Sequence, residues 1–270
     1  MDKSTQDRMQ KRLGLVALFL ASLGLFAAAC GSTTVSPMTG EVDREELVNP
    51  AEDGEEMLTN LPETNPPLGA GDPKIVGSQD MTLEEFAQVI GSDLNAKWQS
   101  LFEGGGYAYS NAGLYLYEAP IPITGCGGVA DPEMGPAYCS HNQTVYYPLT
   151  WTDRSGRTPT QVGDFAVAVV LAHEVGHHVQ NLSGTFQNPN FYTIQLELQA
   201  DCLAGIWGRS VFEEGSLESD DVGEALELMT NAADLPGTPA TDPGAHGTDA
   251  QRIDAFFTGY ESGDAGQCQF

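Results

Sequence analysis

The sequence has few basic residues. Of its 270 residues, 11 are Lys or Arg and 38 are Asp or Glu, which gives a formal net charge of −27 at pH 7. A surface with this balance repels nucleic acid and anionic lipid headgroups, so we expect no nucleic acid partner. We interpret the acidic surface as a means of keeping the protein soluble, and a preference for basic substrates stays open.

Uncharged apolar stretches long enough to approach a membrane span are also scarce, and one stands out. Residues 13–29 are apolar or small, follow four basic residues and precede Cys30. This is typical of a secretory signal, and a Cys after small residues resembles a lipoprotein signal, in which Cys30 is lipidated. We therefore predict a signal peptide over 1–29 and an extracytoplasmic protein, lipid-anchored in the cell membrane on its surface or periplasmic side. An ordinary cleaved signal and a retained span are the alternatives, and 17 residues is at the short limit for a span.

Cysteine is scarce too, with five in the chain and no CxxC pair, so a zinc site made of cysteines is not expected. Besides Cys30, the chain has Cys126, Cys139, Cys202 and Cys268. An even number in an exported chain suggests two disulfides, with buried free thiols as the alternative. Three pairings are possible. The short separation favours Cys126 with Cys139, which leaves Cys202 with Cys268.

Residues 30–75 have too little apolar sequence for a core. Between residues 31 and 73 there are ten acidic residues, one basic residue and six prolines. Such a segment cannot offset the entropy lost on ordering, so we predict an acidic disordered tether over 30–75. The folded domain is then expected over 76–270.

In that domain, strand-like segments precede most of the helical ones. Residues 82–103 predict a helix, and β-rich segments at 114–117 and 144–147 predict strands. We therefore predict an α+β fold, with a small antiparallel sheet followed by a helical half. The later helices are expected over residues 162–181, 192–212, 217–232 and 249–258.

The first of these later helices carries a possible metal site. Residues 165–172 are apolar, which indicates a central helix, and His173, Glu174 and His177 follow at once. Residues four apart share a helix face, so His173 and His177 can bind one metal ion while Glu174 reaches its water. A catalytic zinc site needs a third protein ligand and one open position.

The next helix offers that third ligand. Glu197 lies 20 residues after His177, and a turn over residues 181–190 can return the chain antiparallel, so that Glu197 faces the two histidines. Asp201, one turn further, is placed to accept an N–H from a ligand histidine, with a simple helix charge as the alternative. The sequence thus predicts one zinc ion per chain.

Three further histidines and one arginine need an interpretation. We interpret His178 as a hydrogen-bonding helix residue and His141 as a surface residue. His246 lies in the loop before the last helix, where it either donates to the oxyanion of a tetrahedral intermediate or caps the helix. Arg252 is expected to pair with a carboxylate in a structural role.

Together these motifs resemble a known family. HEVGHHVQ at 173–180, ELQADCLAG at 197–205 and HGT at 246–248, with the cysteines and residues 136–139, are similar to the neutral zinc metallopeptidase family of bacteria over residues 76–270. The resemblance implies a zincin-like domain of the glutamate-zincin type, with the strand after Cys139 as the edge that meets substrate. It implies the zinc ligands His173, His177 and Glu197 and the base Glu174. The metzincin pattern is absent, because Gln180 and Ser183 stand where it needs Gly and His.

The predicted function is that of a membrane-anchored extracytoplasmic zinc metalloendopeptidase. It would hydrolyse peptide bonds in a peptide or protein substrate by means of a zinc-activated water, with Glu174 as general base. A catalytically silent, zinc-stabilised surface lipoprotein that binds a partner is the alternative, and a zinc hydrolase acting on another bond is a weaker one.

Overall fold

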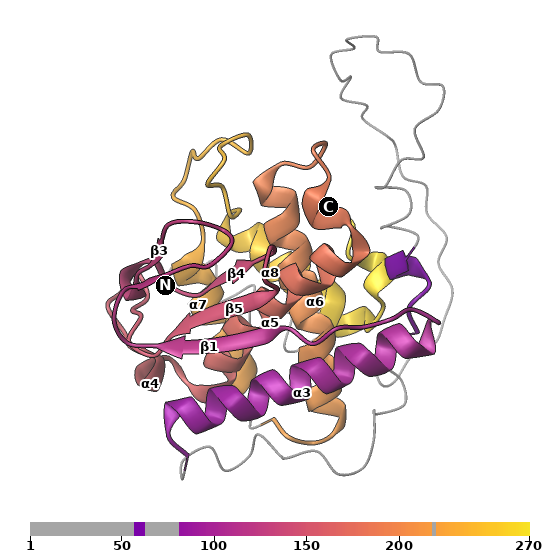
Figure 1. The fold of residues 1–270 in the computed structure, drawn as a ribbon, viewed down its shortest axis with the longest axis horizontal. Coiled ribbons are helices and arrows are strands. Elements are labelled where there is room, and N and C mark those ends of the chain that lie inside the picture. The colour runs from indigo at the N-terminus through magenta and orange to yellow at the C-terminus, as the bar shows by residue number, and fades with distance from the viewer. Residues whose placement is uncertain (1–56, 63–80, 218–219) are drawn as a thin grey trace. The chain divides into compact units, whose positions relative to one another are not determined.

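The computed structural model describes residues 57–62, 81–217 and 220–270 (Figure 1). The predicted signal peptide, the lipidation residue Cys30 and most of the predicted tether lie outside these residues. Among the helices that are described, none combines the length and the apolar character needed to cross a membrane.

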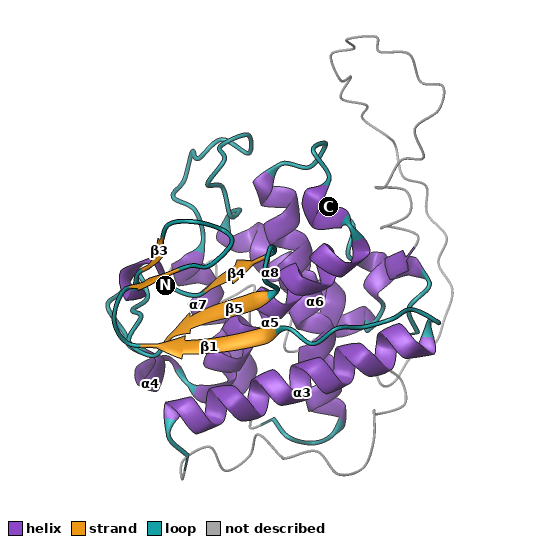
Figure 2. Cartoon of the chain, viewed as in Figure 1, coloured by secondary structure: helices purple, strands orange, loops and turns teal. Residues whose placement is uncertain are grey.

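Helices make up most of the described chain, and the strands lie between residues 113 and 148 (Figure 2). This order confirms the mixed α+β class. The helices are α3 (Leu83–Gly104), α4 (Pro159–Val162), α5 (Asp164–Ser183), α6 (Thr193–Glu213), α7 (Asp221–Ala232) and α8 (Asp249–Ser262). The strands are β1 (Gly113–Tyr117), β2 (Ile121–Pro122), β3 (Val129–Ala130), β4 (Ala137–Cys139) and β5 (Thr144–Pro148), and the 3₁₀ helices are η3 (Pro132–Met134), η4 (Thr185–Gln187) and η5 (Ala265–Gln267).

Helix α3 begins where the sequence predicts. The Thr82 hydroxyl accepts from the Glu85 N–H, and the Glu85 carboxylate accepts from the Thr82 N–H, so two otherwise unpaired donors are satisfied. The buried face of α3 includes Ile90, Leu94 and Trp98. The helix packs on α5 and lies beside β1 (Figure 1).

The larger sheet has the strand order β1-β5-β4. Strands β4 and β5 are antiparallel, but β1 and β5 are parallel, with Leu114 opposite Val145. The prediction of an antiparallel sheet is therefore wrong for β1–β5. The chain between them, residues 118–143, is long enough to return to the end where β1 began, which a parallel pair requires.

The position of β5 corrects a second expectation. The resemblance implies that the strand after Cys139 forms the substrate-facing edge, yet β5 lies in the centre of its sheet, between β1 and β4. Four of its five residues are buried. The edge beside the candidate site is β4, because Ala137 and Tyr138 line the cavity described below.

Both predicted disulfides are present. Cys126 is bonded to Cys139, which joins the β2–β3 hairpin region to β4, and Cys202 is bonded to Cys268, which joins α6 to the chain after η5. The pairing inferred from the short separation is confirmed.

The core is formed around α5, in which 16 of 20 residues are buried. It packs against α3, α6 and α7 and against the sheet. Helix α6 in turn packs closely on α8. A Cβ atom on Gly205 would lie 2.0 Å from the Phe256 carbonyl oxygen, and one on Gly259 would lie 1.8 Å from the Cys202 carbonyl oxygen. Only glycine permits this backbone approach.

Residues 57–62 differ from the predicted disordered tether. Residues 57–59 form a helical turn, and Leu58 and Leu61 are 2% and 4% exposed. Asn60 donates to the Tyr107 hydroxyl, close to the end of α3. For these six residues the prediction of disorder is wrong, because Leu58 in the helical turn and Leu61 just after it are buried in spite of their acidic surroundings. The rest of the tether stays a prediction.

Candidate metal centre

Two histidines of α5 and one glutamate of α6 converge at one point. His173 Nε2 lies 3.2 Å from one Glu197 carboxylate oxygen, and His177 Nε2 lies 3.4 Å from the other. One donor atom from each of the three residues lies within 4.8 Å of the other two. The structure therefore brings together the three residues that the sequence predicts as metal ligands.

A glycine lets the two helices approach at this point. A Cβ atom on Gly176 would lie 2.9 Å from the Ala200 carbonyl oxygen and 3.1 Å from the Ala200 Cα. Gly176 precedes the second histidine, and Ala200 lies one turn after Glu197. The absence of a side chain at Gly176 thus lets α6 lie close enough for Glu197 to reach both imidazoles.

The other nitrogen of His173 contacts Asp201. Its Nδ1 lies 2.8 Å from Asp201 Oδ1, and Arg252 donates to both Asp201 oxygens at 2.7 and 2.8 Å. Because a carboxylate held by arginine is an acceptor, His173 carries a proton on Nδ1, and Nε2 is the nitrogen left to bind a metal ion. Asp201 contacts the histidine as predicted, and Arg252 pairs with a carboxylate as predicted.

The other nitrogen of His177 contacts a residue that the sequence analysis did not place at the site. His177 Nδ1 lies 2.8 Å from Gln180 Oε1. Gln180 is fully buried, although its side chain is polar. Its position three residues after His177 on a helix was the signal available, because residues three apart lie on one face.

The charges at this point favour a cation. Burial lowers the pKa of His173, but Asp201 and Glu197 raise it more, to about 10. Burial also lowers the pKa of His177, and Glu197 outweighs this effect. Glu197 has a pKa held well below its usual range by the histidines, although burial acts in the opposite direction. The carboxylates therefore stabilise positive charge here, carried either by protons or by a metal ion.

Glu174 lies next to the three converging residues and is buried. Burial raises the pKa of its carboxyl group, while the adjacent histidines and the main-chain N–H of Tyr138, which donates to it, act in the opposite direction. Burial raises the pKa of the nearby Tyr147 phenol, and the Glu174 carboxylate acts in the same direction. Glu174 thus lies beside the converging residues as a second buried glutamate, while Glu197 is the one that contacts both histidines.

These residues border a cavity of about 610 Å³. His246 also lines it, but its side chain is 50% exposed. The Asp234 carboxylate accepts from the main-chain N–H groups of His246 and Gly247, which fixes the loop that carries the histidine. The structure therefore places His246 at the cavity, at a more open position than the residues of α5. The lining further includes Met134, Trp151, Val169, Phe186, Leu228 and Met229.

The other two histidines lie away from the three converging residues. His178 is fully buried, and its Nε2 donates to the Ser110 carbonyl oxygen at 2.7 Å. Its Nδ1 therefore accepts from the Tyr138 hydroxyl at 2.9 Å, and burial lowers its pKa. His141 is exposed. Both positions agree with the sequence interpretation.

The donor set fits zinc. Two neutral imidazole nitrogens and one carboxylate are a common ligand set of catalytic zinc, and they leave a fourth position for water or substrate. Both Nδ1 atoms have acceptors, so both Nε2 lone pairs are available to a metal ion. A second acidic group, Asp164, Asp221 and Glu224, also has the required proximity, but it lacks nitrogen donors.

Comparison with known proteins gives a family. Over 202 residues the chain is 37% identical to the uncharacterized protein YpfJ of Escherichia coli K12, which covers 68% of this chain and 70% of that protein. It is 33% identical to the uncharacterized protein Rv2575 of Mycobacterium tuberculosis over 205 residues, or 66% of this chain and 67% of that one. No solved structure matches. Residues 69–270 match the family model described as "Putative neutral zinc metallopeptidase", and the chain belongs to that family.

Proposed function

We propose that the chain is a membrane-anchored, extracytoplasmic zinc metalloendopeptidase. One observation carries the enzymatic part: His173, His177 and Glu197 converge beside Glu174 in a cavity of a member of the zinc metallopeptidase family. The anchoring part depends on the sequence pattern that ends at Cys30.

His173, His177 and Glu197 would hold one zinc ion in a zincin-like arrangement. When bound, zinc polarises the scissile carbonyl and lowers the pKa of water. Glu174 accepts the proton of the attacking water and passes it to the leaving amine. The Tyr138 N–H holds the Glu174 carboxylate in place for this transfer. His246 donates from the rim of the cavity to the oxyanion.

The substrate is a peptide segment in extended conformation. Residues 136–138, at the start of β4, line the cavity, and among the described residues β4 pairs on one side, with β5. An extended peptide can lie along such an edge by main-chain hydrogen bonding. A cleft bordered by a strand accepts the middle of a chain, which supports an endopeptidase.

The test compares the full-length chain with its Glu174→Gln variant. We expect zinc in both, and cleavage of a mixed peptide library, followed by mass spectrometry, to fall by about 10² to 10⁴ in the variant. The His141→Gln variant, at an exposed histidine, should cleave like wild type. Zinc without cleavage in every form would favour the binding lipoprotein, and a folded chain without zinc would overturn the metal centre.

A further inference from the structure

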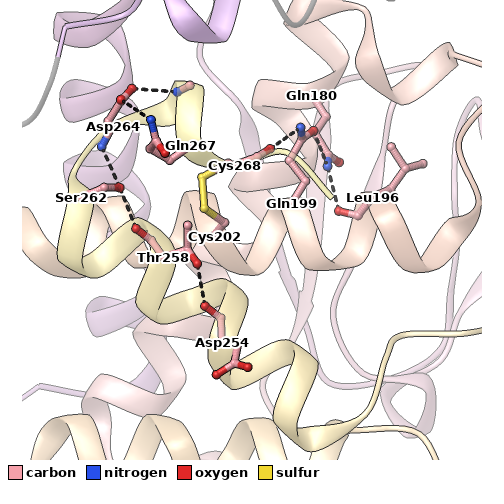
Figure 3. The surroundings of a disulfide bond; sticks show 11 residues. Gln180, Leu196, Gln199, Cys202, Asp254, Thr258, Ser262, Asp264, Gln267 and Cys268 are labelled. Atoms are coloured by element: carbon pink, nitrogen blue, oxygen red, sulfur yellow. Dashed lines mark hydrogen bonds between the residues drawn. A yellow bond between two sulfur atoms is a disulfide. The ribbon is translucent and has the colours of Figure 1, made fainter. Parts of the chain in front are cut away.

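Gln180 and Gln199 form a hydrogen-bonded chain between His177 and the segment held by the second disulfide. Gln180 Nε2 lies 3.0 Å from Gln199 Oε1, and Gln199 Nε2 lies 2.8 Å from the carbonyl oxygen of Cys268. Figure 3 shows the two glutamines side by side, next to the Cys202–Cys268 bond. The two side chains are 0% and 3% exposed.

The direction of every hydrogen bond in this chain is fixed. The carbonyl oxygen of Cys268 can only accept, so the Gln199 amide nitrogen faces it and the Gln199 oxygen faces Gln180. Gln180 Nε2 donates both to that oxygen and to the Leu196 carbonyl oxygen, at 2.7 Å. The Gln180 oxygen is then left to face His177.

These hydrogen bonds determine the tautomer of the His177 imidazole. An amide oxygen can only accept, so the hydrogen bond from His177 requires the proton on Nδ1. The tautomer with Nδ1–H leaves the Nε2 lone pair directed towards Glu197, where the metal ion would lie. Two main-chain carbonyls, of Leu196 and Cys268, therefore determine which nitrogen of His177 can bind metal.

We propose that Gln180 and Gln199 are positioning residues for the metal ligand His177, anchored by the chain segment that the Cys202–Cys268 disulfide attaches to α6. This inference rests on the proposed metal centre. Neither glutamine touches the substrate cavity, so each acts through the histidine. Gln180 contacts the ligand directly, and Gln199 acts one step further away.

Gln195 offers a matched control. It lies on α6 one turn before Gln199, and its Nε2 donates to the Phe270 carbonyl oxygen at 2.7 Å. Its oxygen accepts from the Tyr192 N–H at the start of the helix. A Gln195→Leu variant thus loses one bond to the same terminal segment and a helix cap, without changing the contacts of His177.

The experiment measures zinc affinity in the full-length chain by competition with a chelator of known affinity. We expect the dissociation constant to rise about 10- to 100-fold in Gln180→Leu, to rise less in Gln199→Leu and to stay unchanged in Gln195→Leu. The visible absorption of the cobalt-substituted protein should change in the same order. Unfolding of the zinc-free chain, followed in urea, shows whether each variant is folded.

The outcomes separate the two proposals. A wild-type chain that binds no zinc would overturn the metal centre and the positioning role with it. Equal zinc affinity in wild type, Gln180→Leu and Gln199→Leu would overturn the positioning role alone, whether or not the protein cleaves peptides. If Gln180→Leu does not fold, the difference between Gln199→Leu and Gln195→Leu decides.

Discussion

The two histidines of the metal centre are supported in chemically different ways. His173 donates to Asp201, whose charge is balanced by Arg252 of α8. His177 donates to Gln180, a neutral amide that continues through Gln199 to a main-chain carbonyl. Both supports produce the same result, an Nδ1–H and a free Nε2.

The two supports differ in the energetic cost of losing one partner. A buried carboxylate that loses its arginine loses the larger part of the positive charge that balances it, which is strongly unfavourable in the protein interior. A buried amide that loses one partner leaves a polar group unsatisfied, which costs less. Loss of the charged support, Asp201 with Arg252, should therefore weaken both folding and metal binding. Loss of the neutral support, Gln180 with Gln199, should weaken mainly metal binding.

The largest effect is expected on the charged side. In Arg252→Met, Asp201 stays buried beside His173 without its partner, so the free energy of unfolding of the zinc-free chain should fall by about 3–5 kcal/mol. Gln180→Leu should lower the free energy of unfolding by about 1–3 kcal/mol, because it leaves polar groups but no charge without a partner in the interior. Urea unfolding of the two variants measures the difference, and equal losses would contradict the comparison.

Removing the whole charged support should separate stability from metal binding. In the double variant Asp201→Leu and Arg252→Met no charge is buried alone, so most of the stability lost in Arg252→Met should return. Zinc affinity should nevertheless stay about 10- to 100-fold below wild type, because His173 Nδ1 has no acceptor. Chelator competition and urea unfolding on one preparation test both halves, and a full recovery of zinc affinity would show that Asp201 does not position the histidine.

The smallest effect is expected from the disulfides. Replacing Cys202 and Cys268 by Ala should weaken zinc binding by less than about tenfold, because the Cys268 carbonyl, and not its sulfur, is the acceptor, and Gln195 still holds Phe270. Replacing Cys126 and Cys139 should leave zinc affinity unchanged, since that bond lies in the β-rich half. Equal zinc affinities in the two double variants and wild type would mean that the terminal segment is held without its disulfide.

Much of the charged support could be predicted from the sequence. The spacing of His173 and His177 is that of one helix face, and Glu197 and Asp201 repeat one turn apart on the next helix. The residue types carry this signal, because histidines and carboxylates at such spacing on helices indicate a metal site. Arg252 is predicted to pair with a carboxylate, but which one depends on how α8 packs.

The neutral support could not be predicted in the same way. Gln180 and Gln199 end at main-chain carbonyls, and every residue has a carbonyl, so no residue type at position 196 or 268 indicates the contact. The parallel pairing of β1 and β5 was missed for a related reason. Local patterns predict strands, but the direction of pairing is decided by the course of the chain between them.

The crossing of α6 and α8 restricts how this domain tolerates insertions. Asp201 lies one helical turn before Gly205, and Arg252 lies two turns before Gly259, so each glycine shares a face with a member of the ion pair. One residue inserted between a glycine and its charged neighbour would rotate that neighbour by about 100° around its helix. In evolution, these helices can gain or lose residues outside the intervals from Asp201 to Gly205 and from Arg252 to Gly259. Those two intervals should keep their lengths.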